Sequence, residues 1–94
     1  YSNILVINGS IHSVNVFPNP FSKYFIVEIE NLSEQTITIE LFDVYGKKLY
    51  SEDFSLQSGK NQINISSSFL TNGNYFLKVR NDLQQSYYKI TKNE

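Results

Sequence analysis

Few residues of this chain have the types and spacing that enzyme chemistry requires. The sequence contains one histidine, His12, and no cysteine, which excludes a thiolate nucleophile, a disulfide and a cysteine metal site. His12 has no second histidine or nearby acid at ligand spacing, so we expect a structural or exposed role for it. Glu28 and Glu30 share one face of a predicted strand, and glycosidases use such a pair of neighbouring carboxylates. That face points outward and no pocket-forming elements flank it. We therefore predict a protein that is not an enzyme and that uses no cofactor and no metal.

The composition favours one small β domain. The 94 residues are 40% hydrophobic and 15% aromatic, with seven Tyr and seven Phe, which is typical of a core of rings and β-branched side chains. The net charge of −1 is unevenly spread, because residues 74–93 carry four cations against one acid. The simpler interpretation is solvated strand faces and edge protection by lysine, and the alternative is a basic C-terminal hairpin that docks on a partner. Nucleic acid is an unsuitable partner for a mildly acidic domain.

No segment predicts membrane insertion. No apolar run approaches the ~18 residues that span a bilayer. The given sequence opens at Tyr1 without a Met, a basic region or an apolar region of a signal peptide. We expect it to be a piece of a longer protein.

Apolar residues alternate with polar ones through most of the chain, which predicts short strands. Strands are expected over residues 23–30, 36–44, 47–54, 61–65 and 85–92, with further ones after Gly73 and over 11–17. The side chains predicted to face the core are Phe25, Val27, Ile29, Ile37, Ile39, Leu41, Ile63, Ile65, Tyr75, Leu77, Val79, Tyr88 and Ile90. The pattern predicts an all-β fold, an immunoglobulin-like antiparallel β-sandwich of about seven short strands.

The connections carry recognisable turn signals. Gly46 closes the Asp43–Gly46 hairpin, where a positive φ is expected. The polar run 66–70 predicts a crossing between strands, with one serine-capped helical turn as an option. The prolines of Phe17-Pro18-Asn19-Pro20-Phe21 exclude a central strand, and we expect a stiff, elongated corner that carries the chain from one sheet to the other.

The segment from Leu70 to Arg80 predicts a turn that leads into a strand. Leu70 lies five residues before Tyr75, with Gly73 between them, which resembles the tyrosine corner of immunoglobulin-like sandwiches. The Tyr75 hydroxyl is then expected to bond to the backbone upstream of it.

Five aromatic residues fall on predicted outward phases: Tyr24, Phe42, Tyr50, Phe76 and Tyr87. Rings on a sheet face can stack on sugars, so a carbohydrate-binding or adhesive module of a secreted protein is an alternative function. The competing interpretation is cross-strand pairing or contact with a neighbouring domain.

Four motifs in a fixed order resemble one family, the C-terminal sorting domain of type IX secretion cargo proteins. They are Val16-Phe17-Pro18-Asn19-Pro20-Phe21, Leu41-Phe42-Asp43-Val44-Tyr45-Gly46-Lys47, Leu70-Thr71-Asn72-Gly73-Asn74-Tyr75 and Tyr88-Lys89-Ile90-Thr91-Lys92. Asn72-Gly73 stands where the family often has Pro-Gly or a small residue before Gly, which leaves the turn intact.

The resemblance implies a non-catalytic export signal at the end of a larger cargo protein. In that family the cargo reaches the periplasm of a Gram-negative bacterium, and an outer-membrane translocon recognises the folded C-terminal domain. A sortase-like cysteine protease then commonly removes the domain and attaches the cargo to an anionic lipopolysaccharide at the outer membrane surface; other cargo is released outside the cell. Residues 16–94 would be the sorting domain, and residues 1–15 a linker or first edge strand after an upstream cargo domain.

The resemblance also assigns expected roles to residues. Those expected to shape the fold are Pro18, Asn19, Pro20, Phe21, Asp43, Gly46, Gly73 and Tyr75. Those expected to contact the translocon are Lys89, Ile90, Thr91 and Lys92. Cleavage is expected near Asn8, Gly9 and Ser10. The unpaired edge of the last hairpin is expected to add to a receptor sheet or to form a dimer, and alanine at both Lys89 and Lys92 to block export without changing the melting of the domain.

Overall fold

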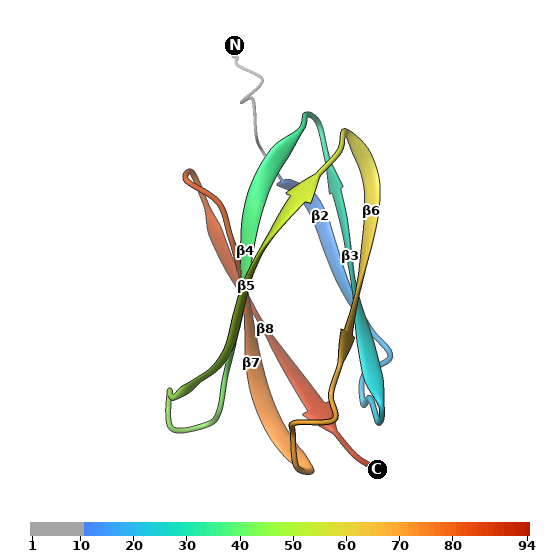
Figure 1. The fold of residues 1–94 in the computed structure, drawn as a ribbon, viewed down its shortest axis with the longest axis vertical. Helices are drawn as coiled ribbons and strands as arrows, with labels where there is room; N and C mark the ends of the chain where they lie inside the picture. Colours follow the sequence, from blue (N-terminus) through green and yellow to red (C-terminus); the bar gives the residue numbers. More distant parts are fainter. Residues whose placement is uncertain (1–10) are drawn as a thin grey trace.

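The computed structural model describes residues 11–94, which contain seven strands (Figure 1). Their bounds are β2 Ile11–Phe17, β3 Tyr24–Asn31, β4 Gln35–Phe42, β5 Lys48–Leu56, β6 Gly59–Ser66, β7 Gly73–Arg80 and β8 Gln85–Lys92. No helix in this part of the chain is long and apolar enough to cross a membrane.

The strands form two antiparallel sheets that pack as a sandwich. One sheet has the order β2-β3-β6 and the other β5-β4-β7-β8. Pairing of β3 with β6, and of β4 with β7 and β7 with β8, is the B–E and C–F–G pairing of an immunoglobulin-like sandwich. The predicted fold class is confirmed, and residues 11–94 contain the predicted number of about seven strands.

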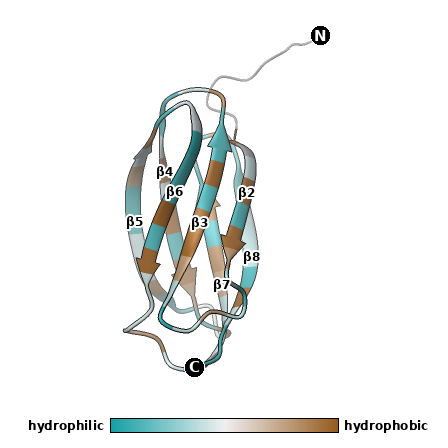
Figure 2. Ribbon diagram, turned by 90° about the vertical axis from the view of Figure 1, so that its right-hand side faces the viewer, coloured by the Kyte–Doolittle hydropathy of each residue, from teal (hydrophilic) through white to brown (hydrophobic). Residues whose placement is uncertain are grey.

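Alternation along each strand places the core where the sequence predicts it. Figure 2 shows apolar and polar bands alternating along β3 and β6, as expected when successive side chains point to opposite faces of a pleated sheet. The residues that the structure buries in the core are Phe21, Phe25, Val27, Ile29, Ile37, Ile39, Leu41, Leu56, Ile65, Leu70, Tyr75, Leu77, Val79 and Ile90. Ile63 and Tyr88 are partly buried against this cluster.

The prediction that Tyr50 faces outward is wrong, because its side chain lies on the core side of the sheet. Leu41 pairs with Tyr50 but Phe42 pairs with Lys48, which leaves Leu49 as an extra residue of β5. This bulge places Leu49 and Tyr50, two consecutive residues, against the core. Burial raises the pKa of the Tyr50 hydroxyl, and the hydrogen bond of this hydroxyl to the Glu52 carboxylate, 2.6 Å, adds to the effect.

Two predicted connections also differ from the structure. The proline segment does not carry the chain into the other sheet, since β2 and β3 pair with each other. The residues after β6 form a β-turn, closed by a hydrogen bond from the Leu70 N–H to the Ser67 carbonyl, 2.9 Å, and contain no helical turn. Ser67 is buried and anchored to neighbouring backbone, which fixes the turn without a helix.

Candidate functional site

The four family-like motifs converge on one end of the sandwich. This C-terminal pole consists of residues 18–23, 43–47, 67–72 and 93–94, which connect or follow strands that end there, together with the adjoining strand ends 73–75 and 90–92 (Figure 1). β2 begins at the opposite pole, together with the turns at 32–34, 57–58 and 81–84. The motif residues therefore gather at the end of the domain away from the start of β2.

Asn19 covers the outer edge of β8 with its side-chain amide. Its Nδ2 donates to the Lys89 carbonyl, 3.2 Å, and its Oδ1 accepts from the Thr91 N–H, 3.1 Å. The flanking Pro18 and Pro20 have no N–H groups, so the amide of Asn19 acts as a substitute for backbone in pairing with an edge strand.

Phe21 continues this edge pairing with its backbone. Its N–H donates to the Thr91 carbonyl and its carbonyl accepts from the Asn93 N–H, both 2.9 Å, in a parallel bridge opposite Lys92. Its ring is buried 5.0 Å from the Phe25 ring. The edge of β8 is therefore already paired over residues 89–93, which contradicts the predicted unpaired edge of the last hairpin along this stretch. Addition of the rest of the hairpin to a receptor sheet stays a prediction.

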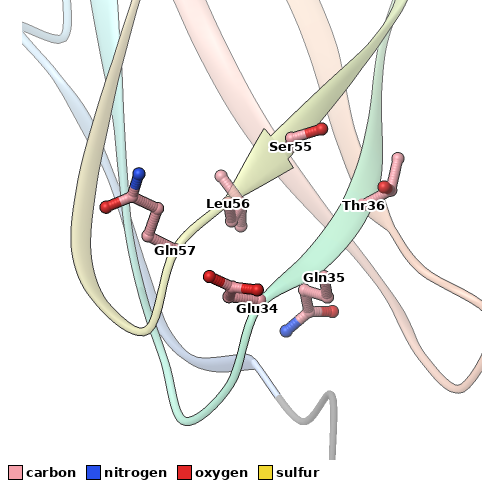
Figure 3. Close-up of a pocket in the computed structure, with 6 residues that line it drawn as sticks. All are labelled: Glu34, Gln35, Thr36, Ser55, Leu56 and Gln57. Carbon is pink, nitrogen blue, oxygen red and sulfur yellow. The ribbon is translucent and has the colours of Figure 1, made fainter.

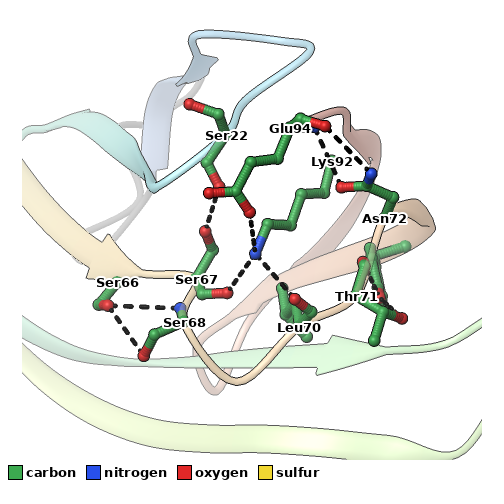
Figure 4. A network of polar contacts seen from close by, with 10 residues as sticks. Ser22, Ser66, Ser67, Ser68, Leu70, Thr71, Asn72, Lys92 and Glu94 are labelled. Atoms are coloured by element: carbon green, nitrogen blue, oxygen red, sulfur yellow. Dashed lines mark hydrogen bonds and ion pairs between the residues drawn. The ribbon is translucent and has the colours of Figure 1, made fainter.

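Lys92 is a buried lysine at the centre of the pole (Figure 4). Its Nζ donates to the carbonyls of Ser67, 2.8 Å, and Leu70, 2.7 Å, and lies 3.5 Å from the Glu94 carboxylate. Its side chain is only 5% exposed. A buried ammonium is tolerated because hydrogen bonds satisfy its protons.

The turn that Lys92 binds is anchored on its other side as well. The Ser67 hydroxyl donates to the Ser22 carbonyl, 2.7 Å, and the Ser67 N–H donates to the Lys23 carbonyl, 3.0 Å. This turn thereby joins the start of β3 to the end of β8. Ser67 was not identified from the sequence, where it lies among three consecutive serines.

Tyr75 forms the predicted tyrosine corner. Its hydroxyl donates to the Thr71 carbonyl, 2.5 Å, and its ring is buried in the core. Gly73 has a φ of +149°, in the region that disfavours side chains. Asn72 bonds to both backbone groups of Glu94, with distances of 3.0 Å to its N–H and 3.3 Å to its carbonyl oxygen.

The last predicted contact motif is divided between surface and interior. Lys89 is exposed and Thr91 half-buried, whereas Ile90 is 1% exposed and Lys92 is held inside the pole. The expectation that alanine at Lys92 leaves melting unchanged rested on an exposed lysine, and the burial of Lys92 contradicts that premise. Recognition of the motif by a translocon stays a prediction.

The β4–β5 hairpin contributes a rigid loop to the same pole. The Asp43 carboxylate accepts from the N–H groups of Tyr45 and Lys47, both 2.9 Å. Gly46 has a φ of +85°, as predicted. This internal bonding of Asp43 leaves Val44 and Tyr45 exposed at the tip.

The outer face of the four-stranded sheet holds a charge cluster that sequence reasoning missed. Glu40 lies between the core residues Ile39 and Leu41 on β4 and points to the outer face, but it is buried beneath cations. Its carboxylate lies 2.8 Å from Lys48 Nζ, 3.1 Å from Arg80 Nε and 3.9 Å from Lys78 Nζ. The hydrogen bond from Lys48, assisted by Arg80, holds the pKa of Glu40 below its ordinary value although burial acts in the opposite direction.

The other residues with possible chemistry do not assemble into a catalytic or metal centre in the described part of the chain. Within residues 11–94 no three His, Cys, Asp or Glu side chains could hold a metal together. Glu28 accepts a hydrogen bond from the Gln62 amide, 2.8 Å, and Glu30 is exposed on the same strand. The predicted cleavage residues Asn8, Gly9 and Ser10 lie outside the described residues.

A hollow of about 440 Å³ lies at the opposite pole, between the ends of β4 and β5 (Figure 3). It is lined by Glu34, Gln35, Thr36, Ser55, Leu56 and Gln57. Only one of these side chains is apolar, so the hollow offers little surface for an apolar ligand.

Comparison with protein families gives a match over most of the chain. The model of the family described as the secretion system C-terminal sorting domain matches residues 15–93. No curated protein matches the chain.

Proposed function

Because this chain belongs to the secretion system C-terminal sorting domain family, we propose that the type IX outer-membrane translocon recognises its folded C-terminal pole during export. The family is one of type IX sorting signals, which implies export to the bacterial surface or the extracellular space. The convergence of all four family-like motifs on one pole is the observation that supports recognition there.

The bonding of the pole supports recognition of a folded domain rather than of a linear peptide. Asn19 and Phe21 are distant in sequence from Ser67 and from Lys92, and these three parts of the chain become neighbours only when both sheets are packed. A receptor that contacts this pole would therefore select folded domains. Of the predicted contact motif, Lys89 presents an exposed charge on the outer sheet face next to the pole, which would mainly steer encounter with an acidic receptor surface.

We also propose that a sortase-like protease removes the domain at the Asn8-Gly9-Ser10 region, which would free an upstream cargo domain for attachment or release. The location of the C-terminal pole supports cleavage in this region. β2 begins at the opposite pole, so a cut before Ile11 would not touch the residues that the translocon reads.

An export assay tests recognition. Residues 1–94 are fused behind a periplasmic reporter with its own signal peptide, in a bacterium that has type IX secretion. We expect the reporter outside the cell, and in the periplasm when residues 85–94 are removed or when the host lacks the translocon. Equal export without residues 85–94 would overturn the proposal.

The same fusion tests cleavage. Mass spectrometry of the domain released from the reporter should give a first residue within residues 8–11. A new end elsewhere, or an intact secreted fusion, would contradict the proposed cleavage region but not the recognition of the pole.

A further inference from the structure

The outer face of β4, β7 and β8, together with the 43–47 loop at the rim of the C-terminal pole, carries an aromatic groove. The groove has a volume of about 410 Å³ and is lined by Phe42, Asp43, Val44, Gly46, Phe76 and Tyr87. Phe42 pairs with Phe76 across β4 and β7, and Tyr87 lies on β8, opposite Lys78. Phe76 is 38% exposed, Val44 55% and Tyr87 58%. Three of the five predicted outward rings are therefore gathered at one place.

The other two rings do not extend this surface. Tyr24 is exposed on the other sheet, and Tyr50 packs against the core and the Phe69 ring, 5.9 Å between ring centres. The groove is thus one local apolar site rather than a platform along the whole sheet. Exposed apolar surface of this kind marks a binding site more often than scattered single rings do.

Cations surround the groove. Lys89 pairs with Phe76 across β7 and β8, and Lys78 Nζ lies 5.5 Å from the centre of the Tyr87 ring. Lys48 and Arg80 project on the same face through their contacts with Glu40. These four cations face three carboxylates: Glu40, Asp53, which is bonded to Thr38, and Asp43 in the groove lining. The face is positive in a chain whose net charge is −1.

Lys89 is the cation of this face that is most available to pair with a carboxylate of a partner. Its ammonium has no ion pair among residues 11–94, while the carboxylate of Glu40 already binds Lys48 and Arg80. Its backbone carbonyl accepts from Asn19, which fixes the position of Lys89 beside Phe76. An ammonium carried on a fixed stretch of backbone next to an apolar groove can pair with a carboxylate whose neighbour enters the groove.

The lining favours a peptide over a sugar. Sugar sites need several polar groups that fix the hydroxyls, but the groove is lined by three rings and a valine. Its one carboxylate, Asp43, already accepts two N–H groups of its own loop. Few polar groups are therefore available to orient a sugar.

We propose that this aromatic groove receives an apolar side chain of an acidic protein segment, with carboxylates beside it that pair with Lys89 and Lys78. The inference rests on the proposed function, since the segment would belong to the export machinery. It adds a second contact surface, on a sheet face, to the C-terminal pole.

Export of the reporter fusion tests the groove with matched controls. The groove variants are Phe76→Thr with Tyr87→Thr, and Lys89→Glu; the controls are Tyr24→Thr and Lys60→Glu, which change an exposed ring and an exposed lysine of the other sheet. We expect the groove variants to lower the secreted reporter by about tenfold or more, the scale of a lost hot-spot side chain. The controls should stay within about twofold of the unmodified fusion.

The outcomes separate the inference from the proposed function. Failure of the unmodified fusion to leave the cell would overturn the function itself. Normal export of the groove variants, or equal loss in the controls, would overturn the groove alone. Urea unfolding of each purified 94-residue variant shows whether the variant is folded. Because Lys89 is exposed, Lys89→Glu should stay folded and still tests the groove if the double variant unfolds.

Binding in solution tests the chemistry of the occupant. The probes are the peptide acetyl-Asp-Glu-Phe-Asp-Glu-amide, its Asn and Gln counterpart, and polygalacturonate, each added to the isotope-labelled chain. We expect the acidic peptide at about millimolar concentration to shift the amide signals of Phe76, Tyr87 and Lys89, the range of weak single-anchor binding. No shift, or an equal shift with the neutral peptide, would overturn the proposal. Shifts of the same signals by polygalacturonate would do so too and would favour a carbohydrate-binding module.

Discussion

The C-terminal pole and the aromatic groove use the same residue types in different environments. Lys92, Phe21 and Tyr75 are buried at the pole, where polar atoms bond to backbone. Lys89, Phe76 and Tyr87 are exposed on the outer sheet face. Residues of one motif, such as Lys89 and Lys92, therefore belong to different regions. A single motif therefore contains buried residues that stabilise the fold and exposed residues that are accessible to a binding partner.

The two phenylalanines should show the largest difference in stability. Phe21→Ala removes a fully buried ring and should lower the free energy of unfolding by about 3–5 kcal/mol. Phe76→Ala removes a ring that is 38% exposed and should cost about 1 kcal/mol or less. Urea unfolding of both variants measures this. A Phe76→Ala variant as unstable as Phe21→Ala would show that the groove is part of the core.

The two lysines test whether the pole depends on its buried ammonium. Lys92→Met keeps much of the side-chain volume but leaves the carbonyls of Ser67 and Leu70 without their donor, so we expect a loss of about 2–3 kcal/mol. Lys89→Met should change stability by about 0.5 kcal/mol or less, because Lys89 is exposed. Equal unfolding midpoints for the two variants would contradict the role assigned to Lys92.

Glu40 is the buried charge of the outer face, and its stabilisation should depend on pH. Its folded-state pKa lies below the ordinary value of 4.5, so its contribution is present above that value and is lost as the pH falls through the folded-state pKa. Glu40→Gln should therefore cost about 1–2 kcal/mol near neutral pH, since hydrogen bonds from charged groups are lost. Urea unfolding at about pH 7 and about pH 3 should show this difference shrinking in acid. A difference that grows in acid would contradict the sign.

Much of the fold could be predicted because alternation reports which face each side chain takes. The same alternation through Tyr88, Ile90 and Lys92 placed Lys92 on the inner face, but a lysine is seldom expected there. Its acceptors are carbonyls more than twenty residues away, which no local pattern reveals. The Asn19 contacts with Lys89 and Thr91 are seventy or more residues apart in sequence.

Strand register hid the remaining features of the site. Tyr50 lies on the inner face rather than the predicted outer face because of the bulge at Leu49, a backbone irregularity that the residue pattern of β5 does not reveal. The groove needs Phe42, Phe76 and Tyr87 to meet across three strands, and this depends on the pairing of β4 with β7 and of β7 with β8. The sequence could therefore predict the outward phase of four of the five rings but not that three of them meet.

The two tyrosines give the smallest and most local comparison between the regions. Tyr75→Phe keeps the buried ring and removes only the hydroxyl that donates to the Thr71 carbonyl, so we expect a loss of about 1 kcal/mol, the net value of one hydrogen bond. Tyr87→Phe removes a hydroxyl from a ring that is 58% exposed and should leave the unfolding midpoint unchanged. It should also leave export unchanged, because the ring rather than the hydroxyl lines the groove. Loss of export in Tyr87→Phe would mean that the groove binds its partner through a hydroxyl, which an apolar anchor does not require.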